Sequence, residues 1–171
     1  LTVAGRIAAF FDLYNTLVDS NTGRLYVQYL RKHVPHELRL RDAIRTLSWL
    51  IAYELHLIDQ YEVTERALRL LKGMNEVEMT RRCEHWFQTM VAEKLFPAWK
   101  GKIAEHRAEG HLTAILTAST GYAAIPVARH LGIDESLFTH LEVRDGKFTG
   151  ATDGPPCNGP GKVYWAKKLA D

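Results

Sequence analysis

The 171-residue sequence predicts an α/β protein whose parallel sheet is interrupted by an all-helical insert. Two short apolar runs, at residues 7–11 and 111–117, have strand length and no polar alternation, as expected for strands buried on both faces. The long stretch between them, residues 21–97, shows helical periodicity and no strand pattern. After it, helix and strand patterns alternate again, which is typical of α/β domains.

These patterns divide the chain into two predicted domains. We expect residues 1–20 and 98–171 to form the α/β core and residues 21–97 to form the helical domain. Within the insert, Gly73 follows a helical pattern at 63–71 and is expected at a helix end. With 19.5 kDa, the chain is long enough to bury a core.

The most apolar window of the insert, residues 47–58, is interrupted by Tyr53, Glu54 and His56. It is also shorter than the roughly 20 residues that span a bilayer. We therefore expect a buried helix there and no membrane partner.

Six further elements are expected after the insert. In order they are a helix at 99–109 ended by Gly110, the strand at 111–117, a helix at 121–130 with Pro126 at a kink or in its first turn, a hairpin of strands 141–143 and 147–149 around Asp145-Gly146, a loop at 150–161, and a helix at 162–169.

Composition excludes several classes of function. The net charge is +2, and no basic stripe with interleaved aromatic residues is present, so we expect no nucleic-acid partner. The two cysteines, Cys83 and Cys157, have no metal-type spacing, and a reduced, cytoplasmic protein is the default. No signal peptide opens the chain. The oligomeric state is left open.

The histidines suggest no metal site. The pairs His33/His36 and His106/His111 have no acidic or cysteine partner at ligand spacing, so we expect them to be surface helix residues.

Three residues combine chemistry with position. Asp12 follows the first buried strand, Thr117 ends the second, and Lys162 opens a helix after a glycine-rich loop. In open α/β sheets, ligands bind at the carboxyl ends of the strands. Phosphate-ester hydrolysis through a carboxylate needs a nucleophile, a cation and hydrogen-bond donors for the phosphoryl oxygens. Singly, each residue has a structural explanation: a turn cap, a helix N-cap and a solvated lysine. Together they predict a phosphate site.

The order of these residues resembles motifs I, II and III of the haloacid dehalogenase (HAD) superfamily. Motif I is a hydrophobic strand followed by D-x-D-x-T, where Asp12 matches the nucleophile and Thr16 the threonine. The stretches 116–119, 126–134, 145–150 and 156–162 resemble the phosphoserine-phosphatase-like branch, subfamily IB. This implies a Rossmann-like core with a C1 cap at residues 21–97, acting on a small phosphomonoester.

The resemblance also implies residue roles. Asp12 becomes transiently phosphorylated, Thr117 and Ala118 bind the phosphoryl oxygens, Lys162 holds Asp12 and the phosphate, and Thr16 orders the motif I loop. Mg²⁺ is the implied cofactor, with the Asp12 carboxylate and the Tyr14 backbone carbonyl among its ligands.

Two departures from the family pattern bear on activity. Tyr14 replaces the second Asp of motif I, the general acid and base. A phenol keeps its proton at neutral pH, so it can donate a proton but is a poor base. The acidic motif IV, which holds Mg²⁺ in the family, does not occur before Asp171. We expect the chain to be incomplete there and at its first residue, which is not Met.

Two alternatives remain. L-2-haloacid dehalogenases carry D-x-Y-G-T and need no metal; Tyr14 matches this pattern, whereas Asn15 stands at its glycine. A non-catalytic HAD-fold protein that binds a phosphorylated ligand or a partner would retain Asp12 and Lys162.

Overall fold

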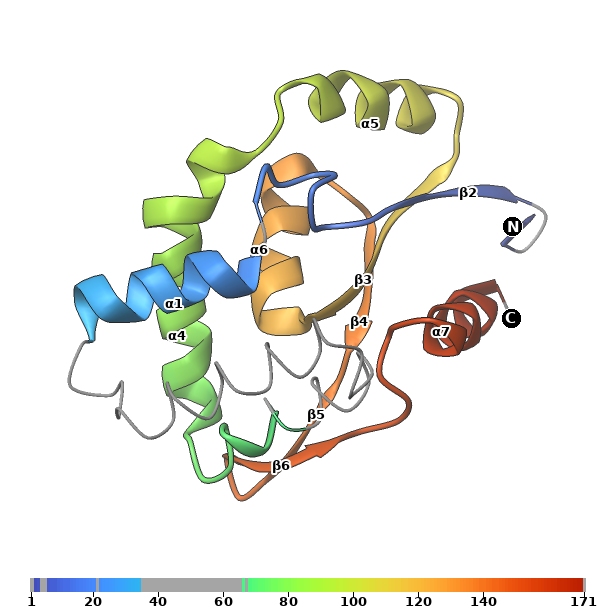
Figure 1. Cartoon of the computed structure of the whole chain (residues 1–171). Coiled ribbons are helices and arrows are strands. Elements are labelled where there is room, and N and C mark those ends of the chain that lie inside the picture. Colours follow the sequence, from blue (N-terminus) through green and yellow to red (C-terminus); the bar gives the residue numbers. More distant parts are fainter. Residues whose placement is uncertain (1, 4–5, 21, 35–65, 67, 171) are drawn as a thin grey trace, which may run out of the picture.

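The computed structural model describes residues 2–3, 6–20, 22–34, 66 and 68–170 (Figure 1). Its elements are β1 Thr2–Val3, β2 Arg6–Phe11, α1 Thr22–His33, α4 Glu76–Trp86, the π-helix η2 Phe87–Val91, the 3-10 helix η3 Ala92–Lys94, α5 Ala98–Ala108, β3 Leu112–Thr120, α6 Gly121–Leu131, β4 Glu135–Thr139, β5 Leu141–Arg144, β6 Lys147–Thr152 and α7 Pro160–Ala170. This is the predicted α/β class.

The main sheet has four strands in the order β1-β2-β3-β4. The two apolar runs form β2 and β3, which pair in parallel with Phe11 opposite Ile115. Strand β4 pairs in parallel with β3, and β1 lies antiparallel at the other edge. The register between β3 and β4 shifts between Leu116 and Thr120, so the carboxyl end of β3 is irregular.

The prediction missed β4, because it placed no element between the helix at 121–130 and the hairpin. Long-range contacts hold this strand. The Asp134 carboxylate accepts hydrogen bonds from the Thr113 backbone N–H at 2.9 Å and from the Thr113 hydroxyl at 2.6 Å. The Asp134 N–H donates back to the hydroxyl oxygen at 3.2 Å. These bonds join residues 21 positions apart, so the sequence pattern of the strand itself does not reveal them. The two-residue strand β1 was missed as well.

Helices cover both faces of the sheet. Figure 1 shows α6 and α7 on opposite sides of β3 and β4, and both helices contact these strands. Ile103 of α5 and Val127 of α6 are buried in one cluster with Phe11 and Ile115. The predictions for these helices were close. However, Pro126 is a buried residue well inside α6 rather than in its first turn.

Helix α7 begins two residues before the predicted start. Its first residue is Pro160, and proline suits that position because the N–H it lacks would have no helical partner there. The predicted loop at 150–161 was therefore too long at this end.

The predicted hairpin is present as β5 and β6. Asp145 and Gly146 have φ values of 51° and 71°, the left-handed conformations that a two-residue hairpin turn requires. Strand β6 continues to Thr152, so the predicted loop was too long at its start too. Backbone atoms of the insert add to this hairpin: the Gly73 N–H donates to the Phe148 carbonyl at 2.8 Å.

The described part of the insert is helical in α1, α4, η2 and η3. Leu25, Tyr29, Trp86 and Val91 are buried in the same cluster as the core strands. Helix α4 is capped by the Asn75 side chain, which accepts from the Glu78 N–H at 3.0 Å. The patterns at residues 44–51 and 47–58 lie outside the described residues, and the domain boundaries stay a prediction. None of the described helices has the length and apolar character needed to cross a membrane.

Candidate functional site

Asp12 follows β2 directly, at the carboxyl end of a parallel strand. The chain then folds into a tight loop in which the Val18 N–H donates to the Leu13 carbonyl at 3.0 Å. Leu13, Leu17 and Val18 are fully buried and anchor this loop in the core. The Asp12 side chain is 41% exposed, so its carboxylate is accessible to a ligand.

Lys162 lies in the first turn of α7, and its Nζ is 3.2 Å from Asp12 Oδ1. The two residues are 150 positions apart in sequence. The structure thus brings together the carboxylate and the cation that sequence reasoning selected. Because both side chains are partly exposed, the pair contributes little to stability, and its position at the strand ends is the more informative property.

Thr117 is fully buried in the irregular part of β3. Its hydroxyl oxygen accepts a hydrogen bond from the Ser119 N–H at 3.2 Å. The Ala118 carbonyl accepts from the Thr139 hydroxyl at 3.0 Å. The same hydroxyl oxygen accepts from the Cys157 N–H at 2.9 Å. One hydroxyl of β4 therefore joins the end of β3 to the loop that leads into α7.

Cys157 joins the candidate residues, although sequence reasoning missed it. Burial raises the pKa of its thiol to about 11; the Lys162 charge and a hydrogen bond from the Thr117 backbone oppose this, and the Asp12 charge adds to it. A buried thiol that interacts with all three residues lies where they converge. Its only sequence signal was its place in the loop before Lys162, within the stretch 156–162 that resembles the family.

The loop residues Tyr14, Asn15 and Thr16 are placed differently. Asn15 has φ 49°, a left-handed conformation that glycine adopts easily and asparagine tolerates. The Thr16 carbonyl accepts a hydrogen bond from the Trp99 indole N–H. Within the described residues, no hydrogen bond joins the Tyr14 or Thr16 side chain to Asp12 or Lys162.

The last residues of the insert are bound to this loop. The Asp19 N–H donates to the Lys94 carbonyl at 2.8 Å, and the Phe96 N–H donates to the Leu17 carbonyl at 3.1 Å. The insert therefore ends beside the residues that position Asp12.

The described residues do not complete a magnesium site at Asp12. No set of three His, Cys, Asp or Glu ligands within the described ranges includes Asp12. Mg²⁺ prefers six oxygen ligands in octahedral geometry.

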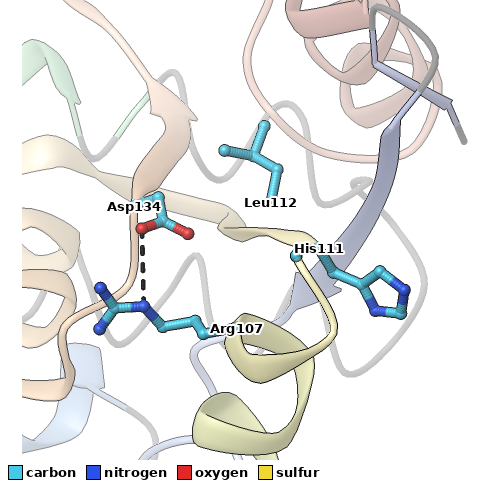
Figure 2. A pocket seen from close by; sticks show the side chains of 5 residues that line it. Arg107, His111, Leu112 and Asp134 are labelled. Carbon is cyan, nitrogen blue, oxygen red and sulfur yellow. Dashed lines mark ion pairs between the residues drawn. The ribbon is translucent and has the colours of Figure 1, made fainter.

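A hollow of about 270 Å³ lies at the amino ends of β3 and β4, opposite the strand ends where Asp12 lies (Figure 2). Its lining residues are Arg107, Gly110, His111, Leu112 and Asp134. The hollow lies at the start of β3, where Leu112 lines it. At about 3.3 Å per residue, Leu112 is about 16 Å from Thr117 along the strand, so the hollow is separate from the Asp12 site.

Figure 2 shows Arg107 and Asp134 pointing toward one another in this hollow, with Nε to Oδ1 at 3.8 Å, and the His111 ring turned away. Burial alone would raise the pKa of Asp134, but the Thr113 hydrogen bonds and the Arg107 charge lower it. The acidic residue of this hollow thus serves the pairing of β3 with β4.

Comparison with known proteins extends these observations. The family model for haloacid dehalogenase-like hydrolases matches residues 9–171. The phosphoserine phosphatase SerB1 of Mycobacterium tuberculosis is 28% identical over 167 residues, which cover 95% of this chain and 54% of that protein. A histidinol-phosphatase of Neisseria meningitidis is 24% identical, with 91% and 70% covered. The chain spans about half the length of the first of these relatives.

Solved structures have the same fold. A protein of unknown function from Bordetella pertussis Tohama I superimposes with a TM-score of 0.81 at 27% identity, covering 98% of this chain and 74% of that one. A substrate-bound phosphoserine phosphatase superimposes with a TM-score of 0.64 at 18% identity, covering 96% and 70%.

Proposed function

Because the chain belongs to the haloacid dehalogenase-like hydrolase family, we propose that it hydrolyses a small phosphomonoester through a phosphorylated Asp12. The observation that carries the proposal is the contact between Asp12 and Lys162 at the carboxyl ends of β2 and β3. A carboxylate with an adjacent ammonium is the minimum set for attack on a charged phosphoryl group.

In the first step, an Asp12 oxygen attacks the phosphorus, and the bond from phosphorus to the ester oxygen breaks. The alcohol leaves with a proton. Lys162 neutralises the phosphoryl oxygens, and Thr117 and Ala118 bind them at the end of β3. In the second step, water attacks the aspartyl-phosphate, which releases inorganic phosphate and restores the carboxylate.

The chemistry of the Tyr14 side chain determines which of the two steps we expect to be slower. Its hydroxyl can supply the proton that the leaving alcohol needs. Tyr14 then regains a proton from solvent, and as a neutral phenol it activates water poorly; the proton of the attacking water leaves with the released phosphate. Loss of positioned acid–base catalysis costs about 10²–10⁴-fold in rate. We therefore expect the second step to be slow and the phosphorylated enzyme to accumulate.

The substrate class follows from the relatives. Phosphoserine and histidinol phosphate, which their names specify, are small phosphomonoesters that also carry an amino group. We propose a substrate of this kind, and we propose that residues 21–97 form a cap that selects it. In the family, bound Mg²⁺ supplies charge neutralisation, and its requirement is part of the test.

The test is an assay of the purified chain with a panel of phosphomonoesters, with and without Mg²⁺. Released phosphate and the mass of the intact protein are measured together. The expected result is turnover, and a phosphorylated species that Asp12→Asn lacks. Tyr14→Asp should raise turnover by restoring the base. Equal phosphate release by the wild-type protein and Asp12→Asn would refute the proposal, and no release by either would favour a non-catalytic binding protein.

A metal-independent L-2-haloacid dehalogenase is the second candidate. The left-handed conformation of Asn15 favours it, because the dehalogenase pattern D-x-Y-G-T has glycine at this position. Release of halide from a 2-haloacid without phosphate would identify that activity.

A further inference from the structure

A cluster of three ligand-type side chains lies at the far edge of the sheet from Asp12. His106 is in the last turn of α5, Glu109 follows that helix, and His111 directly precedes β3. His106 Nδ1 and His111 Nδ1 are 3.0 Å apart, and His111 Nδ1 is 3.4 Å from Glu109 Oε2. The prediction that this histidine pair has no acidic partner was wrong.

We propose that His106, Glu109 and His111 bind a divalent transition-metal ion of the zinc type. Two imidazole nitrogens and one carboxylate oxygen are a common ligand set for Zn²⁺ with an open fourth position. Ligand atoms at tetrahedral bonds of about 2.0–2.1 Å lie about 3.3 Å from one another. The separations of 3.0 and 3.4 Å fit this spacing, and one ligand atom from each residue lies within 4.8 Å of the other two.

The backbone holds this arrangement in place. Gly110 has φ 75°, which reverses the chain after α5, and the His111 N–H donates to the His106 carbonyl at 2.9 Å. The His106 ring packs edge-on against Phe11 at 5.9 Å. Two of the ligands are thus positioned before an ion arrives, which reduces the entropy lost on binding.

The cluster also leaves access for an ion. The Glu109 side chain is 65% exposed, whereas that of His111 is 17% exposed. An ion can enter from the solvent side and keep a water as its fourth ligand. Because two of the three donors are nitrogens, the site should favour Zn²⁺, Ni²⁺ or Cu²⁺ over Mg²⁺.

The proposed ion would join the end of α5 to the start of β3. It lies about 20 Å from Thr117, at the other end of β3, so its role is structural rather than catalytic. Its binding does not depend on the phosphatase proposal.

The experiment uses the full chain without a histidine tag, stripped of metal and titrated with Zn²⁺ and Co²⁺. We expect visible absorption typical of Co²⁺ with nitrogen and oxygen ligands, and a rise in Tm of about 5–10 °C at 100-fold excess of Zn²⁺ over Kd. His111→Ala should weaken Zn²⁺ binding at least tenfold. Glu109→Gln, at an exposed position that does not endanger folding, should weaken it in the same direction.

Two controls make the result specific. His130→Ala removes an exposed histidine of α6 outside the cluster and should leave Zn²⁺ affinity unchanged. Asp12→Asn removes the proposed nucleophile and should also leave it unchanged. The proposal is overturned if His111→Ala and Glu109→Gln bind Zn²⁺ as the wild-type protein does, if Asp12→Asn abolishes binding, or if the wild-type protein binds no Zn²⁺.

Discussion

Gly161 determines how closely α7 approaches the loop before it. A Cβ atom built on this buried residue would lie 1.8 Å from the Pro156 carbonyl oxygen and 3.0 Å from its carbon. Real Cβ atoms essentially never come closer than 3.0 Å, so Gly161→Ala must separate the two backbone segments by about 1.2 Å. No side chain can move to relieve this contact, because the obstacle is backbone.

The displacement has two expected effects. It strains the turn in which the Gly161 N–H donates to the Asn158 carbonyl at 2.8 Å. Overpacking costs about 1–3 kcal/mol, and a weakened hydrogen bond adds about 0.5–1.5 kcal/mol. We therefore expect Gly161→Ala to lose about 2–4 kcal/mol of unfolding free energy. Since Lys162 is the next residue, a shift of about 1 Å should also lower turnover about 10²-fold.

Urea unfolding followed by circular dichroism measures the first effect, and phosphate release from the best substrate measures the second. Gly101→Ala in α5 is the matched control, because its Cβ would meet no atom within 4 Å. That change should stabilise the protein by about 0.5–1 kcal/mol through helix propensity. If Gly161→Ala unfolds at the wild-type urea concentration and keeps wild-type turnover, the close approach of α7 to residue 156 is not as described.

Three further predictions concern side chains. Asp134→Ala should cost about 1.5–3 kcal/mol, because a charged acceptor of two Thr113 hydrogen bonds is lost. The folded-state pKa of Asp134 lies below its ordinary value of 3.8. The loss of unfolding free energy in Asp134→Ala should therefore be constant above pH 3.8 and shrink below it, as acid protonates the wild-type carboxylate. Urea titrations at several pH values measure this loss. Burial raises the pKa of Cys157 to about 11, so a thiol reagent at pH 8 should modify it only after unfolding; rapid labelling of the native protein would contradict this. Lys162→Met should lower turnover about 10²-fold or more, whereas Lys167→Met, exposed on the same helix, should not change the measured rate.

Local sequence patterns predicted much of the fold. Strands β2 and β3 are continuous apolar runs, and the hairpin turn is marked by Asp145-Gly146, whose left-handed conformations fix the strand ends. The placement of Asp12 and Thr117 at one end of the sheet was also predictable, because the carboxyl ends of neighbouring parallel strands lie together. The closeness of Lys162, which lies in α7, was implied only by the family resemblance.

Features that depend on non-local contacts were not predictable. Strand β4 depends on bonds between Asp134 and Thr113, which are 21 positions apart. The cluster of His106, Glu109 and His111 is local in sequence, but it forms only because the chain reverses at Gly110. A spacing of three suits a helix face and a spacing of two a strand face, so no single regular element predicts it. In each case, the contact depends on the three-dimensional path of the backbone, which a local sequence pattern does not determine.

The sequence distance between Asp12 and Lys162 has a consequence for folding order. Pairing of β3 with β4 closes a short loop, whereas β2 reaches β3 only across the whole insert. Long loop closures come late because their entropy cost precedes any contact that compensates for it. On a ribosome, β3 and β4 would therefore associate early, and the carboxylate would meet its lysine only after α7 had been synthesised. The proposed phosphate site should thus assemble only after α7 has been synthesised, later than the pairing of β3 with β4.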